Sequence, residues 1–411
     1  MRLQGMPYVA GQAKGVLQLG LNDDNSGRVV LLRQNELRTV RRPPAAMVVI
    51  DSAPFAHAMI PLLGLGIPTI ILDSDLAVGL RAGMEVGIDG DHGLLTDESE
   101  ELGTLPPTLS ADNLTRDGIE IPLRVSVRDV SAARRAADLG AEAVGLLRSE
   151  YLLPADSGVL PDRAFYQDAF QAICQAATPL PVTIRLLDLA VDKLPAWLPA
   201  LEGVSHAFGY QGARLFTHEP VCSVYQAQLS AIDALSDRFD LRVLIPYLGG
   251  LTELEAWSDQ IRSRLGRPLP LGAMAETPVT ALQLAEWFER VDFVALGCND
   301  LMQNLFGTDR ADPALGRGLD PYAPALYRFL RLVAETAAGN LERLQLCGVL
   351  PQLPGILPLL LGLGFRVFSV EPSSLGYLRR TIAATSRNEA RMLASQVCQA
   401  HDSAQVRTLL D

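Results

Sequence analysis

The sequence is poor in aromatic residues, in cysteine and histidine, and in long uncharged apolar runs. Its five cysteines and five histidines are scattered, without a Cys-x-x-Cys pair or a metal-ligand spacing, which argues against a disulfide framework and a zinc cluster. No apolar run reaches the roughly 18 residues that a membrane helix needs, and the first residues lack the apolar core of a signal peptide. We therefore expect a soluble cytoplasmic protein.

Charge and size narrow the classes of function further. A formal net charge of −12 argues against nucleic acid and anionic membranes as general partners, whereas a small anionic ligand needs only a local basic site. The 411 residues exceed one ordinary core and suffice for two domains. Hydrophobic residues make up 48% and aromatic residues 6%, a composition that suits a large α/β protein with a buried parallel sheet.

The first hundred residues are predicted to form a small, strand-rich α/β domain. Short buried-strand runs occur at 29–32, 46–50, 69–72 and 83–90. A polar stretch with prolines follows, and its composition marks a linker. We accordingly divide the chain into an N-terminal domain (1–103), a linker (104–118) and a C-terminal domain (119–411).

Beyond the linker, strand and helix patterns alternate. Eight strand candidates lie at 121–127, 143–148, 181–187, 241–247, 270–276, 292–298, 344–348 and 365–370. Helices are expected between most of them, for example at 130–139 and 279–290, and the long connection from the third to the fourth strand is expected to hold more than one. This rhythm predicts a (β/α)₈ barrel, with an open doubly wound sheet as the structural alternative.

Reactive residues gather where the predicted barrel strands end, which is where active sites lie in this fold. They are Arg148, Arg185, Glu276, Asp300, Asn299 and Cys347. Arginines suit a phosphate or carboxylate, and the two carboxylates suit Mg²⁺ shared with substrate oxygens. A thiol can serve as an acid or a nucleophile. The set predicts a small anionic ligand held on a metal, with proton transfer at one carbon.

Each of these residues also has an ordinary structural interpretation. A lone arginine at a strand end is more often part of a surface ion pair, and a lone cysteine in an apolar strand is more often a small core residue. Glu276 precedes Thr277 and Pro278, so it also suits the cap of the next helix. It is much less expected that all of these structural interpretations are correct at one set of strand ends. The combination of residues therefore favours a binding site.

Several motifs of the C-terminal domain resemble those of the phosphoenolpyruvate-utilising enzymes, the family of Enzyme I of the sugar phosphotransferase system, phosphoenolpyruvate synthase and pyruvate phosphate dikinase. The matching segments are Gly-Leu-Leu-Arg-Ser-Glu-Tyr at 145–151, Thr-Ile-Arg-Leu-Leu-Asp at 183–188 with Asp-Lys-Leu-Pro at 192–195, Ala-Glu-Thr-Pro at 275–278, Gly-Cys-Asn-Asp-Leu-Met-Gln at 297–303 with Asp-Arg at 309–310, and Leu-Cys-Gly at 346–348. They stand in the family's order, so the resemblance is highly specific.

The resemblance implies a role for each of these residues. It assigns the phosphate of phosphoenolpyruvate to Arg148, Arg185 and Arg310, Mg²⁺ to Glu276 and Asp300, and a phosphate or carboxylate contact to Asn299. Cys347 would protonate the enolate carbon as pyruvate forms. Metal and arginines together would neutralise the phosphate, so that the phosphoryl group can leave in line toward an acceptor.

The N-terminal domain resembles, more weakly, the swivelling phosphohistidine domain of the same family. The segments are Phe-Ala-His-Ala-Met-Ile at 55–60, Gly-Ile-Pro-Thr at 66–69 and Asp-Gly-Asp-His-Gly at 89–93. They imply that His57 receives the phosphoryl group. The family's glycines and Thr-Ser before this histidine are replaced by Ser-Ala-Pro-Phe-Ala at 52–56, which lacks one N–H and two hydroxyls. A merely structural histidine stays as the alternative.

Two further departures concern the ligand. Gly-Tyr-Gln-Gly-Ala-Arg at 209–214 aligns with the family's Gly-Trp-Arg-x-x-Arg. Arg214 is therefore retained as a ligand-binding residue, whereas Gln211 replaces an arginine and removes one positive charge from the site. Val349 stands where the family has glutamate after Cys-Gly.

Three hypotheses follow. The leading one is a Mg²⁺-dependent transfer of the phosphoryl group from phosphoenolpyruvate to His57 with release of pyruvate. The rival is a catalytically weak sensor or regulatory protein that binds phosphoenolpyruvate without forming phosphohistidine. The third keeps the enzyme and changes the ligand, because Gln211 can accommodate a different phosphorylated or carboxylated acid.

The hypothesis of phosphotransfer requires a partner. Enzyme I has a helical insert that binds its phosphocarrier protein, and the stretch between Gly15 and Val48 is too short to hold it. No ATP-grasp domain, which the synthase and the dikinase use, is evident either. We expect the phosphoryl acceptor to be a separate protein, an ATP-grasp partner or a small molecule. The resemblance also implies a homodimer formed through the barrel.

Overall fold

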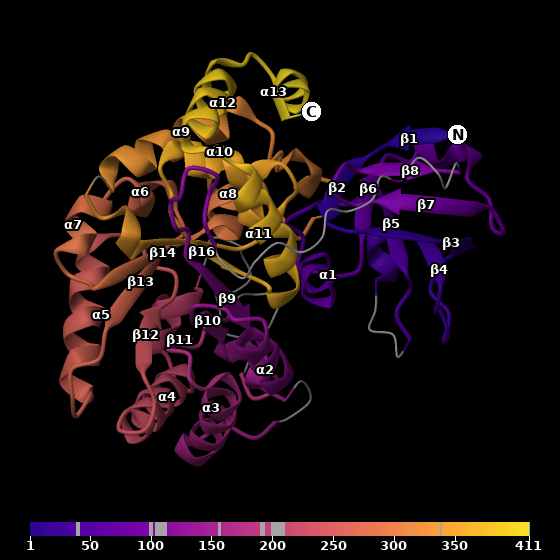
Figure 1. Ribbon diagram of the computed structural model, residues 1–411. Helices are drawn as coiled ribbons and strands as arrows, with labels where there is room; N and C mark the ends of the chain where they lie inside the picture. Colours follow the sequence, from indigo (N-terminus) through magenta and orange to yellow (C-terminus); the bar gives the residue numbers. More distant parts are fainter. Residues whose placement is uncertain are drawn as a thin grey trace.

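The chain folds into an N-terminal sheet domain and a C-terminal barrel with surrounding helices (Figure 1). The computed structural model describes residues 1–37, 42–97, 102, 113–154, 158–189, 194–198, 210–312, 314–337 and 339–410. The predicted linker at 104–118 falls largely outside the described residues. Within the described part, no helix is long and apolar enough to cross a membrane.

The C-terminal domain is a closed barrel of eight parallel strands, as predicted. The strands are β9 (Leu123–Val127), β10 (Val144–Arg148), β11 (Val182–Arg185), β12 (Leu241–Ile245), β13 (Leu271–Ala275), β14 (Phe293–Gly297), β15 (Leu344–Cys347) and β16 (Val367–Val370). Each lies within its predicted range. Closure comes from β16 pairing with β9, Phe368 opposite Leu123, so the open doubly wound alternative is wrong.

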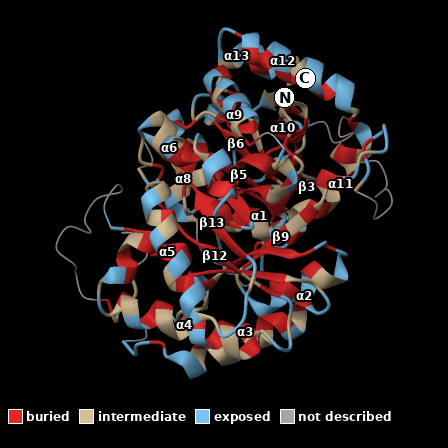
Figure 2. Cartoon of the chain, turned by 90° about the vertical axis from the view of Figure 1, so that its left-hand side faces the viewer, coloured by how far each residue is buried: buried red, intermediate tan, exposed pale blue. Residues whose placement is uncertain are grey.

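Buried apolar side chains fill the barrel and its surround. Leu146, Leu244, Met274, Phe293, Ala295 and Cys347 form a cluster of their own, while a second, much larger cluster joins the strands to the helices. Continuous apolar runs such as 293–297 are typical of parallel strands that are buried on both faces. Figure 2 shows buried strands at the centre and helices that are exposed on their outer sides.

Helices connect the strands on the outside of the barrel. They are α2 (Val130–Asp138), α3 (Arg163–Ala177), α4 (Val221–Leu235), α5 (Leu251–Arg264), α6 (Pro278–Ala281), α7 (Leu284–Phe288), α8 (Cys298–Phe306), α9 (Pro324–Thr336), α10 (Ile356–Leu363), α11 (Leu375–Ala384), α12 (Arg387–Gln399) and α13 (Ser403–Leu410). The described part of the long connection before β12 contains the 3₁₀ helix η6 (Gly212–Thr217) and α4, which agrees with the expectation of more than one helix.

One predicted helix, at 279–290, is two short helices instead. Thr277 caps α6, and the Thr280 hydroxyl returns to the Thr277 carbonyl at 3.0 Å. The chain then tightens, with the Gln283 N–H donating to the Thr280 carbonyl, and α7 starts in a new direction that buries Trp287 and Phe288. The apolar pattern is continuous in sequence, but two caps and a tight turn divide it.

The N-terminal domain is an eight-stranded mixed sheet. Its strands are β1 (Arg2–Gln4), β2 (Met6–Val9), β3 (Gln12–Leu19), β4 (Arg28–Arg33), β5 (Ala46–Ile50), β6 (Thr69–Leu72), β7 (Glu85–Asp89) and β8 (Leu94–Thr96), in the order β1-β8-β7-β3-β4-β5-β6-β2. The four predicted strands are β4 to β7. The other four were not predicted, because they are short or, like β3, bury little apolar surface.

The two domains are in contact at the carboxyl end of the barrel. Helix α1 (Ile60–Leu65) packs against the 3₁₀ helix η10 (Pro372–Ser374), which follows β16. The Ser373 hydroxyl donates to the Leu63 carbonyl across this contact. Figure 1 shows α1 on the barrel side of the sheet domain. The contact brings the loop that carries His57 to the barrel mouth.

Candidate active site at the carboxyl end of the barrel

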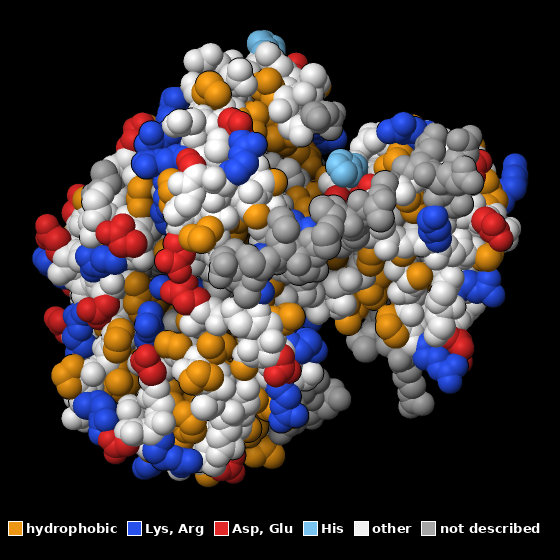
Figure 3. Space-filling view, viewed as in Figure 1, with side chains coloured by type: hydrophobic (Ala, Val, Ile, Leu, Met, Phe, Trp, Pro, Cys, Tyr) orange, Lys and Arg blue, Asp and Glu red, His pale blue; other side chains and the backbone are white. Residues whose placement is uncertain are grey.

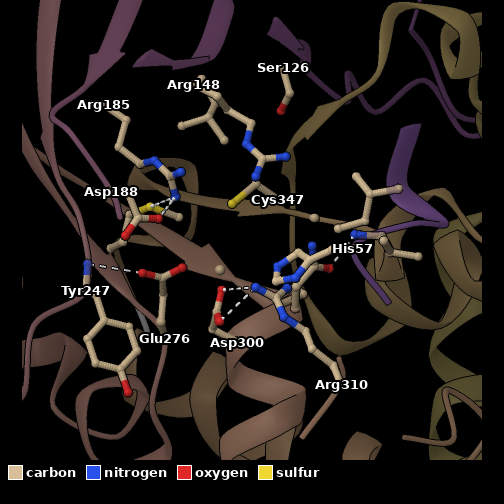
Figure 4. A pocket seen from close by; sticks show the side chains of 18 of the residues that line it. His57, Ser126, Arg148, Arg185, Asp188, Tyr247, Glu276, Asp300, Arg310 and Cys347 are labelled. Carbon is tan, nitrogen blue, oxygen red and sulfur yellow. Dashed lines mark hydrogen bonds and ion pairs between the residues drawn. The ribbon is translucent and has the colours of Figure 1, made fainter. Parts of the chain in front are cut away.

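A cavity of about 800 Å³, its open mouth included, lies where the barrel strands end (Figure 4). Its walls come from β10, β11, β13, β14 and β15 and the loops after them, and its lid carries His57, Ile60 and Leu63 of the N-terminal domain. Nine of the ten residues predicted for the site line it: His57, Arg148, Arg185, Gln211, Glu276, Asn299, Asp300, Arg310 and Cys347. Residues far apart in the sequence thus share one cavity.

Arg214 is the predicted residue that the structure does not bring to the cavity. It lies in η6, its Nε is 3.8 Å from Glu253 Oε1, and its guanidinium lies over the Tyr247 ring at 5.3 Å. Tyr247 itself lines the cavity. Arg214 therefore reaches the site through Tyr247, and its predicted contact with the ligand stays a prediction.

Two arginines on neighbouring strands share one buried carboxylate. Glu150 Oε1 accepts from Arg185 Nη2 at 2.6 Å and from Arg148 Nε at 3.1 Å. Asp188 Oδ2 lies 2.7 Å from Arg185 Nη1. Burial by itself lowers the pKa of Arg185, but the negative charges of Asp188 and Glu150 raise it above its usual value. The arginine pair is thus held in place before a ligand binds.

Glu150 and Asp188 were missed as functional residues by the sequence analysis. Both belong to motifs of the resemblance, at 145–151 and 183–188. Glu150 reaches Arg185 because β10 pairs with β11, Arg148 opposite Arg185, whereas Asp188 meets Arg185 from only three residues further along the chain.

Glu276 and Asp300 form an acidic pair in the cavity. Glu276 is buried, and its Oε2 accepts from the Tyr247 N–H at 3.1 Å. Burial, and then the charges of Asp300 and Asp188, hold the pKa of Glu276 well above its usual range. Arg310 Nη2 lies 3.0 Å from Asp300 Oδ1. A bound cation would relieve the repulsion between the carboxylates.

The pair fits Mg²⁺ rather than a self-sufficient metal cage. No group of three His, Cys, Asp or Glu side chains suited to a metal occurs among the described residues. Mg²⁺ is commonly held by one or two carboxylates together with substrate phosphate oxygens and water. Glu276 and Asp300 supply this number of hard oxygen donors beside arginines that suit a phosphate.

The close approach of Glu276 depends on Gly297, the last residue of β14. A Cβ at position 297 would lie 2.3 Å from Glu276 Oε1 and 2.6 Å from its Cγ. We expect Gly297→Ala to displace this carboxylate and to weaken Mg²⁺-dependent ligand binding roughly 10- to 100-fold, as measured by calorimetric titration with phosphoenolpyruvate and Mg²⁺. Gly318→Ala is the control, because nothing lies within 4 Å of a Cβ there. Equal affinities in both variants would contradict this role.

Cys347 ends β15 inside the cavity. Its thiol donates to the Leu296 carbonyl at 3.4 Å. Burial, reinforced by the charge of Glu276, raises the pKa of Cys347 to about 12. The group is therefore a protonated thiol at neutral pH, which suits a proton donor. Cys298, a second buried thiol, points to the same carbonyl at 3.7 Å.

Two amide side chains complete the wall. Asn299 Oδ1 accepts from the Val349 N–H at 2.8 Å, which fixes the loop after β15. Gln211 is buried, and its Nε2 makes no hydrogen bond within the described part of the chain. A donor without a partner in a cavity is suited to a ligand oxygen. The substituted position thus offers a neutral donor.

The altered loop before His57 is explained by packing. Phe55 and Ala56 are buried in the core that joins the two domains. The loop turns with the Ala56 N–H donating to the Ala53 carbonyl and the Met59 N–H to the Ala56 carbonyl. His57 is half-buried, between the buried Ala56 and the exposed Ala58, and it lines the cavity. The apolar substitutions therefore anchor the loop and leave the imidazole at the site.

Glu371 is a further cavity residue that the sequence analysis missed. It directly follows β16, so the rule that active sites lie at strand ends would have found it. Burial raises the pKa of Glu371, while the charges of Arg128 and Arg148 lower it. Its backbone N–H donates to Gln352 Oε1 at 2.8 Å, and Gln352 Nε2 donates to the Gly348 carbonyl. Gln352 thereby joins the ends of β15 and β16.

Comparison with known proteins gives one family and several relatives. A family model described as "PEP-utilising enzyme, PEP-binding domain" matches residues 107–387. Two proteins named phosphoenolpyruvate-protein phosphotransferase, from Streptomyces coelicolor and Haloferax volcanii, are 28% and 26% identical over 88% and 89% of this chain. A multiphosphoryl transfer protein from Xanthomonas campestris is 28% identical over 88%. The chain spans 67%, 68% and 46% of these relatives' lengths, respectively.

Proposed function

The chain belongs to the PEP-utilising enzymes, and from that premise we propose that it transfers the phosphoryl group of phosphoenolpyruvate to His57 and releases pyruvate. The observation that carries the proposal is the shared cavity, in which His57 of the N-terminal domain joins the arginines, carboxylates and thiol of the barrel. The relatives' names are those of transferases, which favours transfer over the sensor hypothesis.

The proposed binding mode follows from the charges. Arg148 and Arg185 are fixed by Glu150 and can grip the phosphate through paired N–H donors. Arg310 adds a third positive charge beside Asp300. Gln211 offers a neutral amide where an arginine would add a charge. The amide therefore also suits the third hypothesis, in which the ligand is a related phosphorylated or carboxylated acid. Glu276 and Asp300 would hold Mg²⁺, which would supply positive charge to the ligand's oxygens.

The proposed reaction has two steps, phosphoryl transfer to His57 and protonation of the enolate by Cys347. A nitrogen of the His57 imidazole forms a bond to phosphorus while the bond between phosphorus and the enol oxygen breaks, in line with it. The enolate that leaves takes a proton from the Cys347 thiol at its terminal carbon, and pyruvate results. Cys347 then regains a proton from solvent. The lid residues Ile60 and Leu63 shield the site from water while the phosphoryl group moves.

The acceptor and the assembly complete the proposal. Because the relatives are protein phosphotransferases by name, we propose that a separate protein takes the phosphoryl group from His57. An ATP-grasp partner or a small molecule is the alternative acceptor. We further propose a homodimer through the barrel and a cytoplasmic location.

Mass analysis tests the central step. We expect incubation with phosphoenolpyruvate and Mg²⁺ to add one phosphoryl group, about 80 Da, detected on the intact protein under alkaline conditions that preserve phosphohistidine. His57→Ala should lose the whole gain, because the nitrogen nucleophile is absent. If wild-type protein binds phosphoenolpyruvate by calorimetry and yet gains no mass, the transfer proposal is wrong.

A further inference from the structure

A second cavity lies between three helices on the outside of the barrel. It measures about 620 Å³, its open mouth included, and its walls come from α9, α10 and α12. None of the residues that line it also lines the active-site cavity. Its volume falls within the roughly 300–1,000 Å³ of pockets that hold small molecules. We call this cavity the α9–α12 groove.

The helices that form the groove are fixed to one another. A Cβ at Gly362 of α10 would lie 2.0 Å from the Ala390 carbonyl oxygen, so the backbone of α12 rests directly on α10. Arg328 of α9 donates to the carbonyls of Cys398 and Ala400 at the end of α12, both at 2.7 Å. These contacts hold α12 near its start and at its end. The groove beside α9 therefore exists before a ligand binds.

Two arginines line the groove from different helices, together with a single carboxylate. Arg331 of α9 has its Nε 4.0 Å from Glu335 Oε1, and both side chains are more than half exposed, so this pair contributes little. The guanidinium of Arg391 in α12 has no ion pair or hydrogen bond with any residue that the structure describes. An anion in the groove would thus find two available guanidiniums, which suit a phosphate or a carboxylate.

Further arginines make the surroundings of the groove positive. Arg387 lies one turn before Arg391 on α12, and Arg366 directly precedes β16. Burial, followed by the charges of Arg387 and Arg391, lowers the pKa of Arg366, while the charge of Asp117 raises it. Figure 3 shows Lys and Arg side chains gathered, with acidic ones beside them, over the region that Figure 1 labels α9, α10 and α12. Although the chain has a net charge of −12, the local field here favours an anion.

The rest of the lining is partly apolar and partly neutral. Ala394 is buried and Leu363 half-buried, so both offer apolar surface. Ser395 follows Arg391 by four residues and therefore lies on the same face of α12. Burial raises the pKa of Cys398, so its thiol adds no charge. Guanidiniums, a hydroxyl and an apolar wall together suit an organic anion better than a bare inorganic ion.

We propose that the α9–α12 groove is a second ligand site, which binds a small organic anion. The phosphate or carboxylate of this ligand lies between Arg331 and Arg391, where it replaces Glu335 as the partner of Arg331. The Ser395 hydroxyl donates a further hydrogen bond to the acid group, and the apolar part of the ligand packs against Leu363. The site is separate from the active site and does not depend on the proposed function.

Arginine modification by phenylglyoxal, followed residue by residue with tandem mass spectrometry, tests the site on the wild-type protein. Phenyl phosphate and phenylacetate serve as probes, because each joins an aromatic ring to a different acid group. We expect phenyl phosphate, at about ten times its dissociation constant, to slow the modification of Arg331 and Arg391 about tenfold. Inorganic phosphate, which lacks the apolar part, should protect less at the same concentration. The exposed Arg290, which lies outside the groove, should react at an unchanged rate.

Three variants locate the protection within the groove. Arg391→Gln should raise the dissociation constant for phenyl phosphate at least about tenfold, so that protection of Arg331 falls to about twofold at the same concentration. Arg387→Gln removes the same charge from the same helix outside the groove, and it should keep nearly full protection. Ser395→Phe places a ring in the groove from an exposed position. It should remove the protection although both arginines are still present.

The outcomes distinguish the possible ligands from the absence of a site. Protection by phenyl phosphate identifies a phosphorylated ligand, and protection by phenylacetate alone identifies a carboxylated one. The proposal is overturned if neither probe protects Arg331 and Arg391, or if Arg290 is protected equally. Full protection in Ser395→Phe, or equal losses in Arg387→Gln and Arg391→Gln, would also overturn it, because a diffuse basic surface would then explain the binding. None of these readouts involves phosphorylation of His57, so the groove and the proposed function are judged separately.

Discussion

Replacing Arg185 with methionine is expected to abolish ligand binding and to lower the free energy of unfolding by about 3–5 kcal/mol. The side chain is buried and lies between Glu150 at 2.6 Å and Asp188 at 2.7 Å. Without it, Glu150 would keep Arg148 at 3.1 Å, but the charge between Glu150, Asp188 and the nearby Glu276 would be lost. Such uncompensated buried charges are far more costly than the pair itself is stabilising. Calorimetric titration with phosphoenolpyruvate and Mg²⁺ measures the loss of binding, and urea denaturation measures the loss of stability.

Two variants distinguish the effect of losing the buried Arg185 from the effect of losing any positive charge. Arg290→Met removes an exposed arginine that pairs with Glu255 at 3.0 Å, and we expect it to cost less than about 1 kcal/mol. Arg185→Lys keeps the charge but not the planar fork that reaches both carboxylates, so it should regain much of the stability and little of the affinity. An Arg185→Met protein as stable as the Arg290→Met protein would contradict the network described for the site.

Much of the barrel was predictable from sequence because the pattern of apolar residues that forms each strand is local in the chain. A parallel strand buried on both faces must be a short apolar run, as at 293–297 and 367–370. Once the strands are counted, the rule that their carboxyl ends converge predicts a shared site for Arg148, Glu276 and Cys347. The break between α6 and α7 was not predictable in this way, because a continuous apolar pattern conceals a turn made by the Thr277 and Thr280 hydroxyls.

The remaining features of the site depend on pairing between distant residues. That Glu150 bridges two arginines requires the register of β10 and β11, which the sequence does not state. That His57 faces the barrel requires contacts between residues as far apart as Leu63 and Ser373. Arg214 is a different case: its motif predicts a ligand contact, which stays a prediction, and in the structure the side chain lies beside Glu253 and Tyr247. Motifs identify the residue types, and tertiary packing decides which of them meet.

Cys347→Ala is expected to reduce pyruvate release by roughly 10²- to 10⁴-fold, the usual contribution of a positioned acid or base, while affinity for phosphoenolpyruvate stays nearly unchanged. Alanine removes the proton donor but none of the arginines and carboxylates that hold the ligand. Pyruvate formed in a single turnover, measured by coupled reduction to lactate, gives the loss. Calorimetry gives the affinity.

Cys298→Ala is the matched control, since its thiol is also buried and points to the same Leu296 carbonyl. It should lose far less activity, because Cys298 has no role in the proposed steps. A pKa of about 12 also keeps Cys347 protonated well above the pH at which an ordinary thiol ionises. Pyruvate formation should therefore show no loss from thiol ionisation between about pH 7 and pH 10. Equal losses in the two alanine variants would show that the proton comes from elsewhere. A fall in rate centred near pH 8.5 that Cys347→Ala removes would show that the thiol is not shielded as the structure indicates.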